Sequence, residues 1–199
     1  MHKVFKVIGG GLGAILFLFL AIIGATYWFL TTKWKDHYSE VEMRQVADTI
    51  SMAPAMTANF YAAYDRVYPN HRGKSLNQMS WDISLAVITG DEYNSLATKH
   101  CSCIIATRGL KNRISGYHSW AAFMLASGLE EFTTEEKCLD FIYSRLQLEE
   151  YSMKYFQAQP KDLTVDENME LVVRMYSPRY YEEMPELLTE KMAALRSNL

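Results

Sequence analysis

The strongest hydrophobic pattern is at the amino end of the chain, where residues 8–30 are uncharged and almost wholly apolar. This run is longer than the roughly 20 residues that a helix needs to cross the core of a bilayer. A signal peptide has a shorter apolar core, about 7 to 15 residues, and a small-residue cleavage site, whereas this run ends in Tyr27, Trp28 and Phe29. The pattern therefore predicts an uncleaved transmembrane anchor, with Tyr27, Trp28 and Trp34 at the level of the lipid headgroups.

Helical spacing of apolar residues continues after the anchor. Residues 31–52 alternate charged and apolar positions, which predicts a solvated linker helix, and residues 53–67 and 114–132 predict buried helices. Thr133 with Glu136, and Thr164 with Glu167, have the spacing of capping boxes that start two further helices. The predicted core faces of those helices are Cys138, Leu139, Phe141, Ile142 and Leu146 in the first, and Met169, Val172, Val173 and Tyr176 in the second.

Pro185 suits the first turn of a last helix that ends near Ser197. We therefore expect a mainly α protein in three parts: residues 1–30 as amino-terminal tip and anchor, residues 31–52 as linker, and residues 53–199 as one folded domain. The 4 Trp, 13 Tyr and 9 Phe give this domain enough apolar area to fold. A formal net charge of −3 argues against a nucleic-acid partner.

The chain has three cysteines, Cys101, Cys103 and Cys138, so at most one disulfide can form within it. We expect Cys103 and Cys138 to be small, buried hydrophobic residues. The spacing of cysteines and histidines matches no zinc pattern, and neither a metal nor a cofactor is expected.

A polar turn follows the predicted helix over residues 53–67, and residues 62–73 read Ala-Ala-Tyr-Asp-Arg-Val-Tyr-Pro-Asn-His-Arg-Gly. The positions of Asp65, His71 and Gly73 resemble the donor-site signature Glu-Asp-x-x-Phe-x-x-His-x-Gly of glycosyltransferase family 51, the peptidoglycan transglycosylases. In this alignment Tyr64 stands where the family has its catalytic glutamate. Glycan polymerisation needs a carboxylate to accept the proton of the acceptor hydroxyl, and a phenol with an ordinary pKa near 10 is a poor substitute.

Two further segments resemble the same family. Residues 100–112 correspond to Gly-Gly-Ser-Thr-Ile-Thr-Gln-Gln followed by Lys-Asn, with Ser102 in register and Lys111 at the lysine. Arg108 and Lys111 form a basic cluster with Arg113, which either meets an anionic diphosphate or is an ordinary solvated surface. In the predicted helix over residues 114–132, the family register puts Ala122 at the second essential glutamate.

The carboxyl-terminal part carries the family's Tyr-Phe, Asp-Leu-Thr-x-x-Glu and Pro-x-x-Tyr elements, at Tyr155, Phe156, Asp162, Leu163, Thr164, Glu167, Pro178 and Tyr180. The resemblance implies a lysozyme-like helical transglycosylase domain behind one transmembrane helix in a bacterial inner membrane, with the amino end cytoplasmic and the domain periplasmic. It also implies a substrate-binding set, which comprises Asp65, His71, Gly73, Ser102, Arg108 and Lys111.

Two functions follow from the resemblance. In the first, the protein is a pseudoenzyme, catalytically impaired because Tyr64 and Ala122 replace both carboxylates, and it acts in cell-wall assembly by binding lipid-linked glycan or a wall-synthesis partner in the envelope. In the alternative it is an active peptidoglycan glycosyltransferase that uses Asp65 as a displaced base. A further carboxylate beside Asp65 would favour the alternative.

Two apolar features are open to two interpretations each. Gly9 and Gly13 are spaced for close approach of two membrane helices in a homodimer, or are simply tolerated in an anchor. The apolar patch over residues 81–88 either dips into the membrane, as in the family, or belongs to the core.

Overall fold

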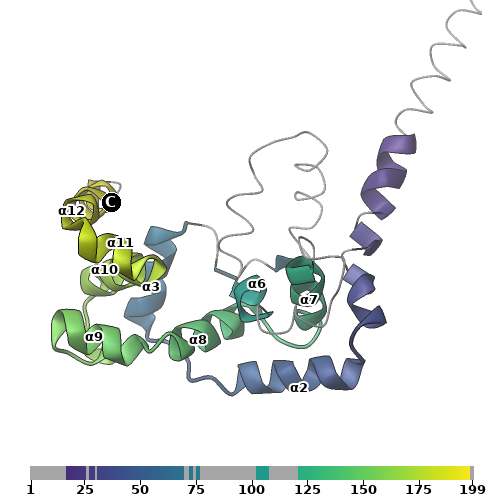
Figure 1. The fold of residues 1–199 in the computed structure, drawn as a ribbon, viewed down its shortest axis with the longest axis horizontal. Helices are drawn as coiled ribbons and strands as arrows, with labels where there is room; N and C mark the ends of the chain where they lie inside the picture. Colours follow the sequence, from purple (N-terminus) through teal and green to yellow (C-terminus); the bar gives the residue numbers. More distant parts are fainter. Residues whose placement is uncertain are drawn as a thin grey trace, which may run out of the picture. The chain divides into compact units, whose positions relative to one another are not determined.

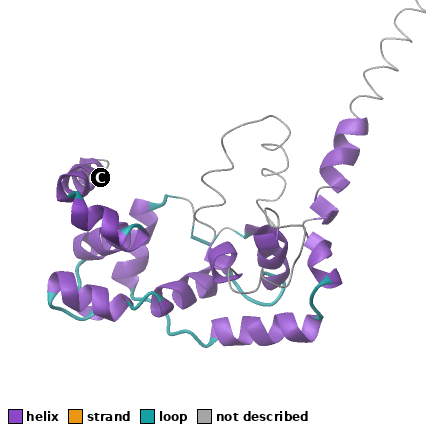
Figure 2. Ribbon diagram, viewed as in Figure 1, coloured by secondary structure: helices purple, strands orange, loops and turns teal. Residues whose placement is uncertain are grey.

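The computed structural model describes residues 17–25, 27–29, 31–69, 72–73, 75–76, 102–107 and 121–197. The regular structure of these residues is helical and includes no strand (Figure 1, Figure 2), which confirms the expected mainly α fold. The chain divides into two compact units, unit 1 with residues 1–44 and 75–132, and unit 2 with residues 45–74 and 133–199.

The described part of the predicted anchor is helical at residues 17–25 and 27–29. Most of its large apolar side chains are exposed, namely Phe17, Leu18, Leu20, Ile22, Tyr27 and Trp28. No single helix within the described ranges is long and apolar enough to cross a membrane. Residues 8–16, with Gly9 and Gly13, lie outside the described residues.

Unit 1 is built around the side chain of Trp34, in the short 3-10 helix η1 (Lys33–Asp36). Its other described helices are α6 (Ser102–Ala106) and α7 (Ala121–Leu129), and α2 (Glu40–Ser51) begins in this unit. The Trp34 ring is fully buried, its Nε1–H donates to Oε1 of Glu131 at 3.3 Å, and it meets the Phe132 ring edge-on at 6.2 Å. The prediction that Trp34 lies at the headgroup level is therefore wrong, because helix α7 covers its ring.

The predicted solvated linker over residues 31–52 is also wrong along one face. Besides Trp34, the side chains buried there are Tyr38, Met43, Ala47 and Ile50, whereas Val41 is exposed. The alternating pattern of this segment did not show that one side of α2 is packed.

Gly128 provides the space for Trp34. A Cβ atom at position 128 would lie 2.6 Å from Cγ of Trp34, which is closer than real Cβ contacts come. The indole therefore packs directly on the backbone of α7.

We expect Gly128→Ala to lower the free energy of unfolding by about 1–3 kcal/mol, because the added methyl overpacks the Trp34 ring despite the better helix propensity of alanine. Thermal unfolding followed by circular dichroism measures the change. Gly24→Ala is the control, since a Cβ there meets nothing within 4 Å. Equal melting temperatures for the two variants would contradict the close packing of Trp34 on α7.

Unit 2 holds the remaining helices, α3 (Ala58–Val67), α8 (Glu135–Arg145), α9 (Leu148–Phe156), η4 (Pro160–Asp162), α10 (Val165–Tyr176), α11 (Pro178–Glu183) and α12 (Pro185–Ser197). Helices α3 and α10 pack side by side (Figure 1). Their facing sides are apolar and buried, with Phe60 and Ala63 from α3 and Met169 and Val172 from α10. This packing holds the helix that carries Tyr64 and Asp65.

The caps of two helices test the sequence predictions. The capping box at the start of α10 is confirmed, with the Thr164 side chain accepting from the Glu167 N–H and the Glu167 carboxylate accepting from the Thr164 N–H. The box at Thr133 is wrong, because the N-cap of α8 is Thr134, whose Oγ1 accepts from the Lys137 N–H. The predicted last helix is confirmed as Pro185–Ser197.

Two predicted core positions are exposed, Leu146 by 44% and Tyr176 by 55%. Helix α8 ends at Arg145 and α10 ends at Tyr176, so both residues lie where the helix and its buried face stop. The remaining predicted positions of the α10 face, Met169, Val172 and Val173, are buried as expected.

Candidate functional site

Tyr64, the residue at the predicted position of the catalytic base, lies in an aromatic cluster inside unit 2. Its side chain is only 3% exposed. The ring stacks on Phe60 at 6.5 Å, meets Tyr143 edge-on at 6.2 Å and lies 5.1 Å from the Tyr68 ring. Burial raises the pKa of both the Tyr143 and Tyr68 phenols above the usual range, so these neighbours stay neutral at physiological pH. Tyr64 thus belongs to a neutral, packed core.

Asp65 follows Tyr64 in the last turn of α3 and is held by Arg72. Arg72 Nε donates to Oδ1 at 2.9 Å and Arg72 Nη2 donates to Oδ2 at 2.6 Å, so both carboxylate oxygens accept hydrogen bonds. The hydrogen bond to Asp65 is the main cause that raises the pKa of the Arg72 guanidinium. The same guanidinium lies over the Tyr61 ring, 5.0 Å from its centre, which is within the range of a cation–π contact.

Two more carboxylates reach this turn from the start of α8. Oε2 of Glu136 accepts from Arg72 Nη1 at 3.2 Å, so Asp65 and Glu136 share one guanidinium. Oε2 of the buried Glu135 accepts from the Gly73 N–H at 3.0 Å. Gly73 has a φ of +76°, in the left-handed region that favours glycine. The backbone conformation of this turn therefore accounts for a glycine at position 73, which matches the glycine of the family motif.

Asp140 is the buried anchor point between α8 and α3. Its side chain is 1% exposed, and its Oδ1 accepts from the Tyr61 hydroxyl at 2.6 Å and from the Met56 N–H at 3.2 Å. Lys137 Nζ pairs with its Oδ2 at 3.4 Å. Burial first, then the hydrogen bond to Asp140, raise the pKa of the Tyr61 phenol, so Tyr61 remains a donor.

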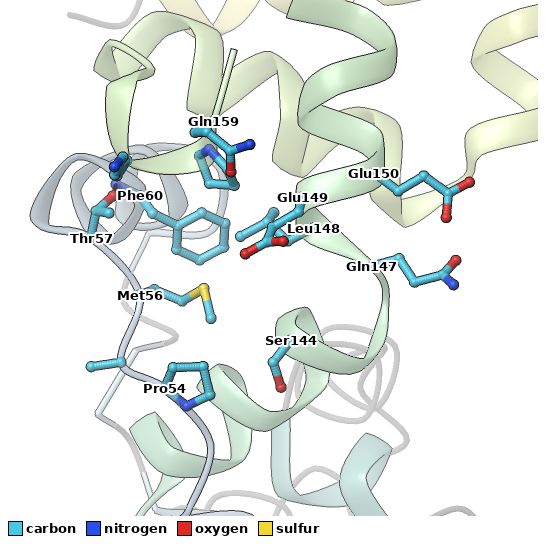
Figure 3. A pocket seen from close by; sticks show the side chains of 13 residues that line it. Pro54, Met56, Thr57, Phe60, Ser144, Gln147, Leu148, Glu149, Glu150 and Gln159 are labelled. Carbon is cyan, nitrogen blue, oxygen red and sulfur yellow. Dashed lines mark hydrogen bonds between the residues drawn. The ribbon is translucent and has the colours of Figure 1, made fainter. Parts of the chain in front are cut away.

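A cavity of about 580 Å³ lies at the opposite end of α3 from Asp65 (Figure 3). It is lined by Pro54, Ala55, Met56, Thr57, Phe60, Ser144, Gln147, Leu148, Glu149, Glu150, Gln159, Pro160 and Lys161. No predicted site residue lines it.

The other predicted site residues fall in unit 1 or outside the described residues. Ser102 is the first residue of α6 and is buried, and Ala122 is a half-buried residue of α7. Outside the described residues lie His71, Arg108 and Lys111, together with Cys101, Arg113 and the apolar patch over residues 81–88.

Two acidic residues that follow α7, Glu130 and Glu131, are engaged within unit 1 and do not supply a carboxylate beside Asp65. Glu130 accepts from the Ser75 hydroxyl at 2.6 Å and from the Leu76 N–H at 2.7 Å, and Glu131 accepts from Trp34. The carboxylate that shares Arg72 with Asp65 is instead Glu136, which the sequence suggested only as a helix cap. Nothing in a seven-residue separation indicated the Asp65–Arg72 pair, since it depends on the turn between them.

Cys103 and Cys138 are buried and disulfide-bonded. Their expected burial is confirmed, whereas the sequence had left their disulfide state open. Across the described residues, no group of three His, Cys, Asp or Glu side chains is placed to hold a metal ion.

No protein-family model matches the chain, and neither a curated protein nor a solved structure shows a significant match to it. The likeness to family 51 therefore rests on the motif residues alone.

We expect Asp140→Ala to lower the free energy of unfolding by about 2–4 kcal/mol, because it leaves the Tyr61 hydroxyl and the Met56 N–H without their acceptor. Urea unfolding followed by circular dichroism measures this. Asp140→Asn keeps an acceptor oxygen and is expected to lose less than half as much. Equal losses for the two variants would show that the hydrogen bonds to Oδ1 are not the main contribution.

Proposed function

We propose that this protein is a membrane-anchored, catalytically impaired relative of the family 51 peptidoglycan glycosyltransferases, which acts in cell-wall assembly by binding lipid-linked glycan or a wall-synthesis partner. The observation that carries the proposal is the state of the two residues at the base position. Tyr64 is packed inside an aromatic core, and both oxygens of Asp65 accept hydrogen bonds from Arg72.

A general base needs a free lone pair within reach of the proton that it accepts. Tyr64 is nearly without solvent contact, and Arg72 occupies a lone pair on each oxygen of Asp65. Loss of general base catalysis alone lowers a rate by about 10² to 10⁴. Binding of glycan does not need that base, so this geometry supports a binding role better than polymerisation.

Two observations support the proposed location. The exposed large apolar side chains between Phe17 and Trp28 have the character of a surface that contacts lipid. The disulfide-bonded state of Cys103 and Cys138 suits an oxidising compartment such as the periplasm, since cytoplasmic thiols are normally kept reduced. Both observations support the proposed location of the folded part outside the cytoplasmic membrane.

The second candidate function is an active glycosyltransferase with Asp65 as a displaced base. The observation in its favour is that Glu136 shares Arg72 with Asp65, which provides two carboxylates and a cation in one place. In this mechanism Arg72 would move to a departing diphosphate and leave Asp65 free to accept the proton of the acceptor hydroxyl.

Polymerisation of lipid-linked disaccharide-peptide by the detergent-purified chain tests the proposal against the second candidate. We expect no glycan polymer from the native chain or from Asp65→Asn, together with retained binding of the lipid-linked substrate. Polymer from the native chain that disappears with Asp65→Asn would establish the second candidate. Failure to bind either the lipid-linked substrate or a wall-synthesis protein would overturn the proposed function.

Tyr64→Glu is not expected to restore polymerisation. A carboxylate at this buried position would have the rings of Phe60 and Tyr143 as neighbours, so it would be destabilised by several kcal/mol if ionised and would stay protonated instead. We expect a lowered melting temperature and no product, measured beside Tyr64→Phe as the size-matched control. A stable Tyr64→Glu variant that makes polymer would show that the site opens as it does in an active family member.

Membrane topology gives an independent test of the proposed location. Alkaline phosphatase fused after Leu199 is expected to be active in a bacterial host, because that reporter folds only outside the cytoplasm where its disulfides form. A green fluorescent protein fusion at the same position is the reciprocal control. Fluorescence without phosphatase activity would place the folded part in the cytoplasm.

A further inference from the structure

The cavity at the start of α3 has the size of a ligand site and an apolar interior. Its volume of about 580 Å³ falls within the usual range for ligand pockets, about 300 to 1,000 Å³. The apolar part of its lining is Pro54, Ala55, Met56, Phe60, Leu148 and Pro160. An apolar group that enters it leaves water, which is the main source of binding free energy for such a pocket.

The walls of the cavity are fixed before any ligand arrives. The Met56 N–H donates to buried Asp140, which holds the segment that precedes α3. On the other side the Asn59 side chain donates to the Leu163 carbonyl at 3.0 Å, and Ser152 Oγ donates to the Ala158 carbonyl at 2.6 Å. A preformed site loses little conformational entropy on binding.

The charge at the rim favours a cation. Glu149 and Glu150 lie in the first turn of α9 and both line the cavity. The lining thus has two acidic side chains and one basic side chain, Lys161. In Figure 3 the Glu149 side chain turns toward Phe60, whereas the Glu150 side chain turns away from it. Within the described residues no ion pair or hydrogen bond engages the Glu149 carboxylate. This carboxylate beside an apolar wall is complementary to an ammonium group carried on an apolar chain.

Polar groups between the apolar interior and the charged rim suit a peptide. The Gln159 amide and the Ser144 hydroxyl line the cavity and can pair with a peptide N–H or carbonyl. Lys161 can donate to a second carbonyl. The cavity is also larger than one side chain, so two adjacent residues can enter together.

We propose that this cavity binds a peptide segment of a partner protein that presents an apolar side chain next to a lysine. The apolar side chain lies against Phe60 and Met56, and the lysine ammonium pairs with Glu149. The inference stands apart from the proposed glycan binding, because no residue of the Asp65 and Arg72 region takes part in it.

Isothermal titration of the full chain in lipid nanodiscs tests the proposal, with N-acetyl-leucyl-lysine amide as the probe and the same peptide acetylated on Nζ as the neutral comparison. We expect the acetylated peptide to bind at least about fivefold more weakly, because the charge-assisted bond to Glu149 is lost. Affinity for the charged peptide is expected to fall as salt is raised.

Glu149→Gln and Glu150→Gln form a matched pair, since both remove one exposed carboxylate from the first turn of the same helix. We expect Glu149→Gln to weaken binding of the charged peptide by about fivefold to tenfold and Glu150→Gln by less than twofold. Circular dichroism confirms that each variant is folded, and binding of lipid-linked substrate should be unchanged in both.

Three results would overturn the inference. These are no binding of the charged peptide up to millimolar concentration, equal affinity for the charged and acetylated peptides, and equal losses with Glu149→Gln and Glu150→Gln. Equal affinity for the two peptides would show instead that the cavity accepts apolar groups of any kind, including lipid chains.

Discussion

The structure of unit 2 depends on one buried carboxylate, Asp140. It accepts hydrogen bonds from the Tyr61 hydroxyl and the Met56 N–H, and so joins α8 to both α3 and the segment before it. A buried carboxylate is tolerated only when its oxygens are satisfied, and here Lys137 supplies the compensating charge. The position of α3 therefore depends on this polar contact as well as on its apolar packing against α10.

The position of α3 has opposite consequences at its two ends. Its carboxyl end packs Tyr64 among aromatic rings and presents Asp65 to Arg72, so the region that resembles a catalytic site is closed and charge-compensated. Its amino end forms one wall of a preformed apolar cavity, with an acidic rim that no described side chain neutralises at Glu149. The features suited to binding a ligand, the apolar cavity and the Glu149 carboxylate, thus lie at the end of α3 that carries no family motif. This division is what makes a binding protein the better proposal for unit 2.

Unit 1 shows how a residue near an apolar segment can be misjudged. Trp34 follows the predicted anchor closely, and an amphipathic ring there suits the membrane interface. The absence of a side chain at Gly128 lets α7 approach the indole, and Glu131 accepts its N–H, so the ring is satisfied inside the protein. An indole has an apolar ring and one polar N–H group. It therefore suits a membrane interface, and it suits a protein core equally well when one hydrogen-bond acceptor lies beside the N–H.

The sequence by itself determined the helical class, the capping box at Thr164, the last helix from Pro185 and the buried face of α10, because these depend on local spacing and on contacts within a few residues. It also singled out Asp65 and Gly73. Only the tertiary structure decided that Tyr64 is core, that Arg72 holds Asp65, and that Glu135 and Glu136 reach the Gly73 turn. Each of these depends on residues that are separated by a turn or by more than sixty positions, and helical periodicity carries no information about such pairs. The cavity at the start of α3 is a clearer case still, since three segments form it and none has a recognisable pattern of its own.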